Sequence, residues 1–243
     1  MPKVVEYHRP SSVEEALELL ARPTATVLAG GTLVNATPTT HPVIAVDISR
    51  LGLSGIELLT DGRLRLGAAT TLQQIVDHPL VPAVLRELAR RESVSTLRTL
   101  ATVGGTLAAG GPESELVAGL LVCEAEVTLR SATGAKSIRF SDLLSDCDHL
   151  LSTLIVDATI HVDGTLAADR TGRTPGDVAI VSAVARRTTD GRTLVALSGV
   201  APTPVLVDSV DSLSPVGDFR GSAEYRKHLA SVLSARVRSE VAK

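Results

Sequence analysis

Apolar and polar residues alternate in short helical and strand-like stretches along the first 52 residues of the chain. Behind Ser12, apolar residues recur at spacings of three and four, which predicts a helix with one buried face. Ser12 and Glu15 have the spacing of a capping box at the start of that helix. Two short apolar runs, at 25–28 and 43–48, have the length and character of buried strands. This order of elements predicts a small α/β unit over residues 1–52.

The alternation continues through a second segment, residues 53–163. Its pattern predicts strands at 64–67, 126–130, 138–140 and 154–162, and helices at 72–76, 82–91 and 112–123. Three neighbouring aspartates near the end of this segment are expected in a solvated loop, and they are Asp142, Asp146 and Asp148.

The last third, residues 164–243, has a different pattern. Asp190-Gly191 stands between two apolar runs, which is a strong signal for a β-hairpin. A connector rich in proline and serine follows at 202–215, and Ser222 has the position of a cap for a final helix. The spacing in that helix predicts one shared face for Tyr225, Leu229, Val232 and Leu233.

Composition narrows the classes of function. The net charge of −3 and an aromatic content of 2% argue against nucleic-acid binding, which uses basic surfaces and base stacking. No apolar run reaches the roughly 18 residues of a membrane span, and the N-terminus does not resemble a signal peptide. Cys123 and Cys147 are too few for an iron–sulfur cluster, which takes about four ligands. We therefore expect a cytoplasmic protein without a membrane or nucleic-acid partner.

The sequence contains no familiar catalytic motif. The six histidines are scattered, so we expect no metal site, and no nucleophile can be matched with a base. Catalytic residues are therefore left unassigned.

Two glycine pairs are the most informative feature of the chain. Gly30-Gly31-Thr32-Leu33 and Gly104-Gly105-Thr106-Leu107 each follow a short apolar run, and they are 74 residues apart. Glycine permits positive φ and the close approach of a ligand, and successive N–H groups in such a turn form an anion-binding concavity. Two such turns would hold the two phosphates of one dinucleotide from opposite sides. The alternative is that both are ordinary turns at strand ends.

These segments resemble the FAD-binding subunits of molybdenum hydroxylases, the family of the carbon monoxide dehydrogenase medium subunit and the flavin domain of xanthine dehydrogenase. Ala29-Gly30-Gly31-Thr32-Leu33 is similar to the family's pyrophosphate loop, and Thr102-Val103-Gly104-Gly105-Thr106 to its second glycine loop. Glu115 falls where the family has an aspartate that bonds the ribose. His149-Leu150-Leu151-Ser152 resembles a flavin contact, and Ala223-Glu224-Tyr225-Arg226 a helix near the C-terminus.

The resemblance implies an α/β (α+β) fold in three parts. Two small α/β subdomains, 1–52 and 53–163, would bind FAD between them, and residues 164–243 would form a C-terminal domain of antiparallel sheet and helix. The implied partners are an iron–sulfur small subunit and a molybdopterin large subunit, from which electrons pass through FAD to an acceptor. The implied FAD contacts are Leu28, Ala29, Gly30, Gly31, Thr32, Leu33, Thr102, Gly104, Gly105, Thr106, Glu115, Leu151 and Arg170, with Arg173 as the alternative to Arg170.

Some positions depart from the family pattern. Thr106 replaces an asparagine, Glu115 replaces the aspartate, and the segment 140–151 is shorter than usual. These departures keep open a stand-alone or repurposed protein that acts on a small molecule, with or without FAD. A purely structural scaffold is a third possibility, but it leaves the paired glycine loops unexplained.

Overall fold

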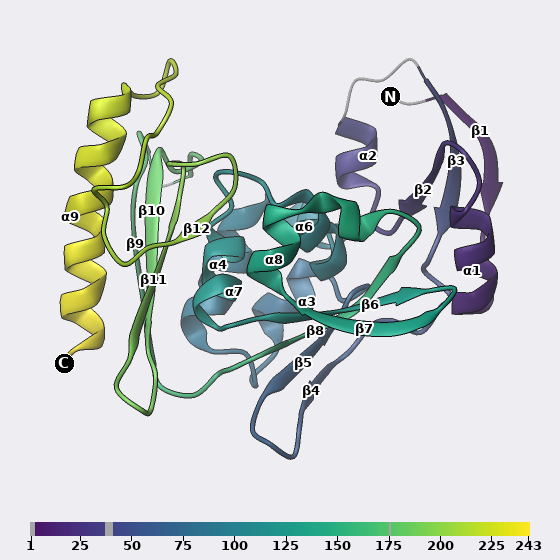
Figure 1. Ribbon diagram of the computed structural model, residues 1–243, viewed down its shortest axis with the longest axis horizontal. Helices are drawn as coiled ribbons and strands as arrows, with labels where there is room; N and C mark the ends of the chain where they lie inside the picture. The colour runs from purple at the N-terminus through teal and green to yellow at the C-terminus, as the bar shows by residue number, and fades with distance from the viewer. Residues whose placement is uncertain (1–2, 37–40, 175) are drawn as a thin grey trace.

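The computed structural model describes residues 3–36, 41–174 and 176–243, in which three sheets lie in a row (Figure 1). The N-terminal sheet is parallel and has the strand order β1-β3-β2. Its strands and flanking helices are β1 (Lys3–His8), α1 (Val13–Leu20), β2 (Ala25–Leu28), α2 (Thr32–Ala36) and β3 (Pro42–Asp47). This is the small α/β unit that the apolar pattern predicts, with β1 and α2 as additions.

The cap of α1 differs in one detail from the expected capping box. The Ser12 hydroxyl accepts a hydrogen bond from the N–H of Glu15 at 3.1 Å. The Glu15 carboxylate accepts the N–H of Ser11 at 2.8 Å, one residue earlier than the reciprocal bond of a capping box. Both bonds satisfy backbone groups at the helix start, and they turn Ala16 and Leu17 toward the sheet.

The middle of the molecule is a five-stranded antiparallel sheet covered by helices, with the strand order β4-β5-β8-β6-β7. Its strands are β4 (Ile56–Leu58), β5 (Leu64–Gly67), β6 (Glu126–Ser131), β7 (Gly134–Arg139) and β8 (Leu154–Ile160). The helices that connect them are α3 (Leu72–Asp77), α4 (Ala83–Glu92), α5 (Ser95–Arg98), α6 (Val103–Ala109), α7 (Glu115–Val122), α8 (Phe140–Ser145) and the 3-10 turn η1 (Cys147–Leu150). Every residue of α7 is buried, so this apolar helix forms the centre of the largest core.

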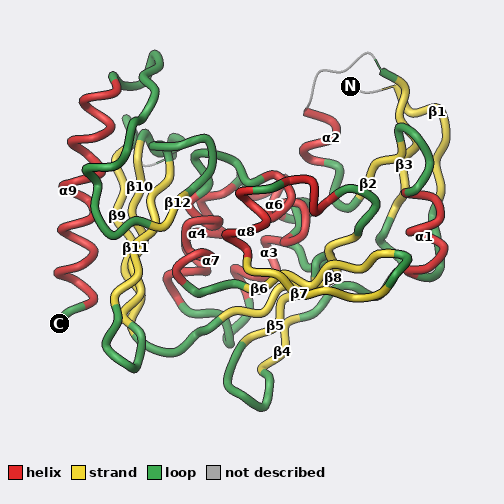
Figure 2. The backbone as a smooth tube through the Cα atoms, in the orientation of Figure 1, coloured by secondary structure: helices red, strands yellow, loops and turns green. Residues whose placement is uncertain are grey.

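The C-terminal part is a four-stranded antiparallel sheet with the order β12-β11-β10-β9, and the long helix α9 lies along it (Figure 2). The elements are β9 (Thr165–Thr171), β10 (Val181–Arg187), β11 (Thr193–Ser198), β12 (Val205–Leu206) and α9 (Ala223–Val241). The hairpin predicted at Asp190-Gly191 is confirmed, because β10 and β11 pair across that turn. One face of the sheet packs on α9 and the other on α7, which explains why β10 is buried along nearly its whole length.

The buried face of α9 agrees with the predicted one only in part. Leu229 and Leu233 are buried and Val232 is half-buried, but Tyr225 is 43% exposed, and Arg226 occupies the interior position that was expected for Tyr225. The Arg226 guanidinium donates to the carbonyls of Ile180 and Gly199, both at 2.7 Å. An arginine can be buried when its guanidinium group has such hydrogen-bond partners. A prediction from the spacing of apolar residues does not find it, because arginine is counted as polar.

The segment after β7 is helical instead of an open loop. Phe140, expected as the end of a strand, begins α8 and is buried. Asp146 caps η1 by accepting the N–H of Asp148 at 3.0 Å. Two of the three aspartates therefore define a turn that returns the chain to β8.

The division of the chain at residues 52 and 163 stays a prediction. Val184 and Ala196 of the C-terminal sheet lie in the same apolar core as α7 and the middle sheet. None of the helices within the described residues combines the length and the apolar character that crossing a membrane requires.

Candidate cofactor site

A cleft of about 850 Å³ lies between the N-terminal sheet and the helices of the middle part. This volume is within the range of pockets that bind cofactors and other small molecules. The chain reaches the cleft at the end of β2, the end of α4, the start of α6 and the turn before β8. The cleft brings together ten of the residues proposed from the sequence, namely Ala29, Gly30, Gly31, Thr32, Leu33, Thr102, Gly104, Gly105, Thr106 and Leu151.

The first glycine loop joins β2 to α2 and packs tightly on the middle part. A Cβ atom at Gly30 would lie 1.7 Å from the carbonyl oxygen of Leu100, so only glycine allows this approach. Gly31 has a φ of 69°, in the left-handed region that favours glycine. Within the described residues, the N–H groups of Gly30, Gly31 and Thr32 make no hydrogen bond. Three successive backbone donors are therefore available to an anion in the cleft.

The second glycine pair is different, because it lies in the first turn of α6 and its donors are already used. The N–H groups of 103–106 bond to Thr70 O, Ala68 O, Thr102 Oγ1 and Thr102 O, at 2.9, 2.8, 3.2 and 2.9 Å. A Cβ at Gly104 would lie 2.9 Å from the Cβ of Ala68, so this glycine permits close packing of α6. The geometry therefore does not support two loops that donate to phosphates from opposite sides. The second loop forms a wall of the cleft.

Charged side chains are rare in the cleft. Among the described lining residues, the only two are Arg22 and Glu92. Arg22 holds both oxygens of the Glu6 carboxylate at 2.8 Å, which neutralises its charge locally. The backbone donors of the first loop are therefore the main electropositive feature of the described lining.

Three of the proposed contacts lie outside the lining of the cleft: Leu28, Glu115 and Arg170. Glu115 begins α7 and is buried, with Oε1 at 3.2 Å from Nη1 of Arg170 and Oε2 at 3.6 Å from Nη1 of Arg91. Burial raises the pKa of Glu115 in spite of these two guanidinium groups. Arg170 also donates to the carbonyl of Asp177. Glu115 and Arg170 thus form an ion pair that ties α7 to β9.

The turn before β8 places an exposed apolar residue at the cleft. Leu151 is 69% exposed, and Ser152 has a φ of 52°, which is uncommon for a residue other than glycine. The Thr153 hydroxyl donates to the carbonyl of His149 at 2.7 Å and holds this turn. Strained turns of this kind often occur at ligand sites.

Glu92 is a charged lining residue that the sequence did not reveal. It is the last residue of α4, where a carboxylate follows Arg90 and Arg91 and is typical of a solvated helix end. Its place in the cleft depends on the packing of α4 against α7, which no local pattern encodes. Within the described residues, no group of three or more histidine, cysteine, aspartate or glutamate side chains is arranged to hold a metal ion.

Comparisons with known proteins agree with this architecture. The model of the family described as "FAD binding domain in molybdopterin dehydrogenase" matches residues 3–160. The chain is 31% identical to the uncharacterized protein YgfM of Escherichia coli strain K12, over 96% of this chain and 94% of that protein. It is 30% identical to the 6-hydroxypseudooxynicotine dehydrogenase complex subunit alpha of Paenarthrobacter nicotinovorans, over 100% of this chain and 95% of that protein.

A solved structure shows the same fold over nearly the whole chain. A chain of the reconstituted CO dehydrogenase from Oligotropha carboxidovorans superposes with a TM-score of 0.87 at 25% identity, covering 98% of each chain. The family match covers the N-terminal sheet, the central cleft and the five-stranded sheet. The chain therefore belongs to the family of FAD-binding domains of the molybdopterin dehydrogenases.

Proposed function

We propose that this chain is an FAD-binding electron-transfer subunit that holds FAD, without a covalent bond, in the central cleft. The observation that carries the proposal is the row of three backbone donors at Gly30, Gly31 and Thr32, which lines a cleft of about 850 Å³. The pyrophosphate of a dinucleotide is the kind of anion that such a row of N–H groups binds. The residues present therefore fit the cofactor that the family name implies.

The chain's own residues would bind and orient the cofactor. The first glycine loop would donate to the pyrophosphate, while Gly104 lets α6 pack closely enough to form the opposite wall. Leu33 and Leu151, both exposed at the cleft, would cover the apolar flavin ring. When bound, FAD supplies a carrier of two electrons, which no side chain of this protein can replace.

The partners that we propose are an iron–sulfur subunit and a molybdopterin subunit. Relatives support a multi-subunit setting, because one is named as a subunit of a dehydrogenase complex and another as the carbon monoxide dehydrogenase medium chain. Among the described residues that line the cleft, Glu92 is the one carboxylate, and we find no acid–base pair that could take up the proton of an organic substrate while a flavin accepts its electrons. Electrons would therefore reach the cleft from another subunit. The location that we propose is the cytoplasm.

The proposal is tested by purifying the tagged protein from its native host under mild conditions. We expect stoichiometric FAD together with two further subunits, one with iron–sulfur clusters and one with molybdopterin, identified by mass spectrometry and metal analysis. The alternative, a flavoprotein that works alone, predicts a different result. In that case the isolated chain would contain FAD and would reduce it with an organic substrate in a stopped-flow experiment without any partner.

A further inference from the structure

Glu92 is the one carboxylate among the described residues that line the central cleft. It ends α4 and is half-buried, next to Ser93 and Leu97 of the same wall. A half-buried carboxylate is unfavourable unless its oxygens have partners. The question is which partners the cleft and a bound ligand supply.

Neighbouring groups fix the position of this carboxylate but do not neutralise it. Glu92 Oε2 accepts the N–H of Leu116 at 3.3 Å, and Ser114 supplies a second hydrogen bond. Both groups belong to the start of α7, where a negative charge is favourable. Within the described part of the chain, Glu92 has no ion-pair partner, and burial raises its pKa. A carboxylate has about four acceptor positions, so these two bonds leave capacity for a ligand.

Glu115 has the opposite arrangement. It lies outside the lining of the cleft, and its two oxygens face the guanidinium groups of Arg170 and Arg91. An acid that is bound in this way to two cations has a structural role between α7, β9 and α4. Glu92, at the end of α4, and Glu115, at the start of α7, therefore have separate roles, and only Glu92 lines the cleft.

We infer that Glu92, and not Glu115, accepts hydrogen bonds from sugar hydroxyl groups of the bound dinucleotide. The inference rests on the proposed function. A carboxylate repels the phosphates and accepts from hydroxyl groups, so it favours a sugar at this position. Two sugars have this chemistry, the ribose of the adenosine half and the ribityl chain of the flavin half.

The test is a titration of the cofactor-free protein with FAD, followed by quenching of flavin fluorescence. Glu92→Leu should weaken FAD binding by about tenfold or more, which is the effect of losing a hydrogen bond to a charged group. Glu92→Gln keeps the size and one acceptor, so it should weaken binding less and leave the melting temperature near that of the wild type. Glu115→Gln is the matched control, which should lower the melting temperature and change the FAD affinity by less than about twofold.

Titrations with ADP and with FMN separate the two sugars. Weaker binding of ADP in the Glu92 variants assigns the contact to the ribose, and weaker binding of FMN assigns it to the ribityl chain. If Glu92 had only a structural role, its substitution would weaken the binding of ADP and of FMN equally, and only in proportion to the loss of stability. That result would contradict the inference. The inference is overturned if both Glu92 variants bind FAD like the wild type, or if Glu115→Gln is the variant that loses affinity. A wild-type protein that does not bind FAD would instead overturn the proposed function, and this inference with it.

Discussion

Gly30 brings the N-terminal sheet and the middle part into direct backbone contact at the cleft. A Cβ at this position would overlap the Leu100 carbonyl, at 1.7 Å, and neither backbone segment can rotate away as a side chain would. The structure therefore assigns Gly30 a packing role in addition to its free N–H group. A substitution here should damage the fold and the site together.

We predict that Gly30→Ala lowers the free energy of unfolding by about 2 kcal/mol or more, which is typical of overpacking. Gly111→Ala is the matched control in the same cleft, because a Cβ there would meet the Cβ of Ser114 at 4.0 Å. That control should remain within about 1 kcal/mol of the wild type. Urea unfolding of both variants checks the prediction, and equal stabilities would contradict it.

Cys123 provides a second test at the scale of one residue. The thiol is fully buried at the end of α7, and burial raises its pKa to about 12. The thiolate is the reactive form, so this cysteine should not react with a thiol reagent at mildly alkaline pH while the protein is folded. The measurement uses a Cys147→Ser background, so that one thiol is counted. Rapid labelling of the native protein would show that the α7 core opens readily.

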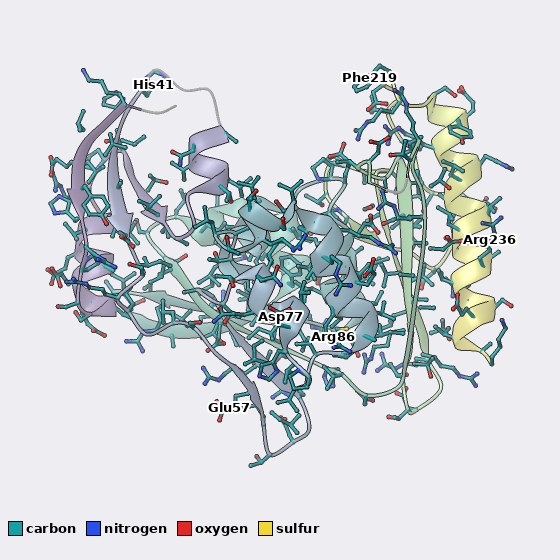
Figure 3. All side chains as sticks on the ribbon, turned by 180° about the vertical axis from the view of Figure 1, so that it is seen from behind. His41, Glu57, Asp77, Arg86, Phe219 and Arg236 are labelled. Carbon is teal, nitrogen blue, oxygen red and sulfur yellow. The ribbon has the colours of Figure 1, made fainter. Side chains whose placement is uncertain are left out.

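At the scale of elements, α9 is anchored to the C-terminal sheet by one buried arginine. Arg226 is 3% exposed, donates to two carbonyl oxygens of the sheet, and pairs with Asp218 at 2.7 Å. Arg236 lies on the same helix (Figure 3), is largely exposed, and contacts Asp169 at 3.3 Å. The two arginines form a matched pair with different surroundings.

We expect Arg226→Ala to cost about 3 kcal/mol of unfolding free energy, because it leaves two buried carbonyl groups without their donor and removes the ion pair with Asp218. Arg236→Ala should cost less than about 1 kcal/mol, as is usual for exposed ion pairs. Thermal or urea unfolding of both variants gives the comparison. Similar losses would mean that α9 is held by its apolar face alone.

The same scale shows how far the sequence predicts the structure. The strand–helix order, the Ser12 cap of α1 and the Asp190-Gly191 hairpin were all predictable, since each depends on residues close together in the chain. Strands β1 and β9 were not predicted. β1 is an exposed edge strand, and β9 mixes polar and apolar residues. The pattern of apolar and polar residues is weak in both strands. β1 forms because it pairs with β3, and β9 forms because it pairs with β10.

The candidate site was predictable in part for a similar reason. The two glycine pairs lie on opposite walls of the cleft. Their sequences are alike, but within the described part of the chain the N–H groups of Gly30, Gly31 and Thr32 are free and those of the second loop are already hydrogen-bonded. The N–H groups of Val103 and Gly104 bond to the carbonyls of Thr70 and Ala68, which lie more than 30 residues away in the sequence, and the N–H of Gly105 bonds to Thr102 Oγ1. Glu115, which was expected at the cofactor, pairs with Arg170 instead, and Glu92, for which the sequence indicated no role, faces the cleft and contacts the start of α7.

At the scale of the whole molecule, the three sheets lie in a row (Figure 1). A cleft of about 850 Å³ lies between the N-terminal and middle parts. Among its described lining residues, the cleft has free backbone N–H donors and few charged side chains. These features fit a long ligand that is an anion in one part and apolar in another. The alignment to the Paenarthrobacter subunit runs over 288 positions, more than the 243 residues of this chain. At least 45 of the 288 aligned positions therefore have no residue of this chain opposite them, because the chain has 243 residues.

The most direct test of the central claim is the absorption spectrum of the purified protein, before and after incubation with FAD. The structure predicts the two visible bands of an oxidised flavin and a stoichiometric amount of FAD, released intact when the protein is denatured. Identification of the released flavin distinguishes FAD from FMN. A folded protein that stays colourless after incubation with FAD would contradict the assignment of the cleft.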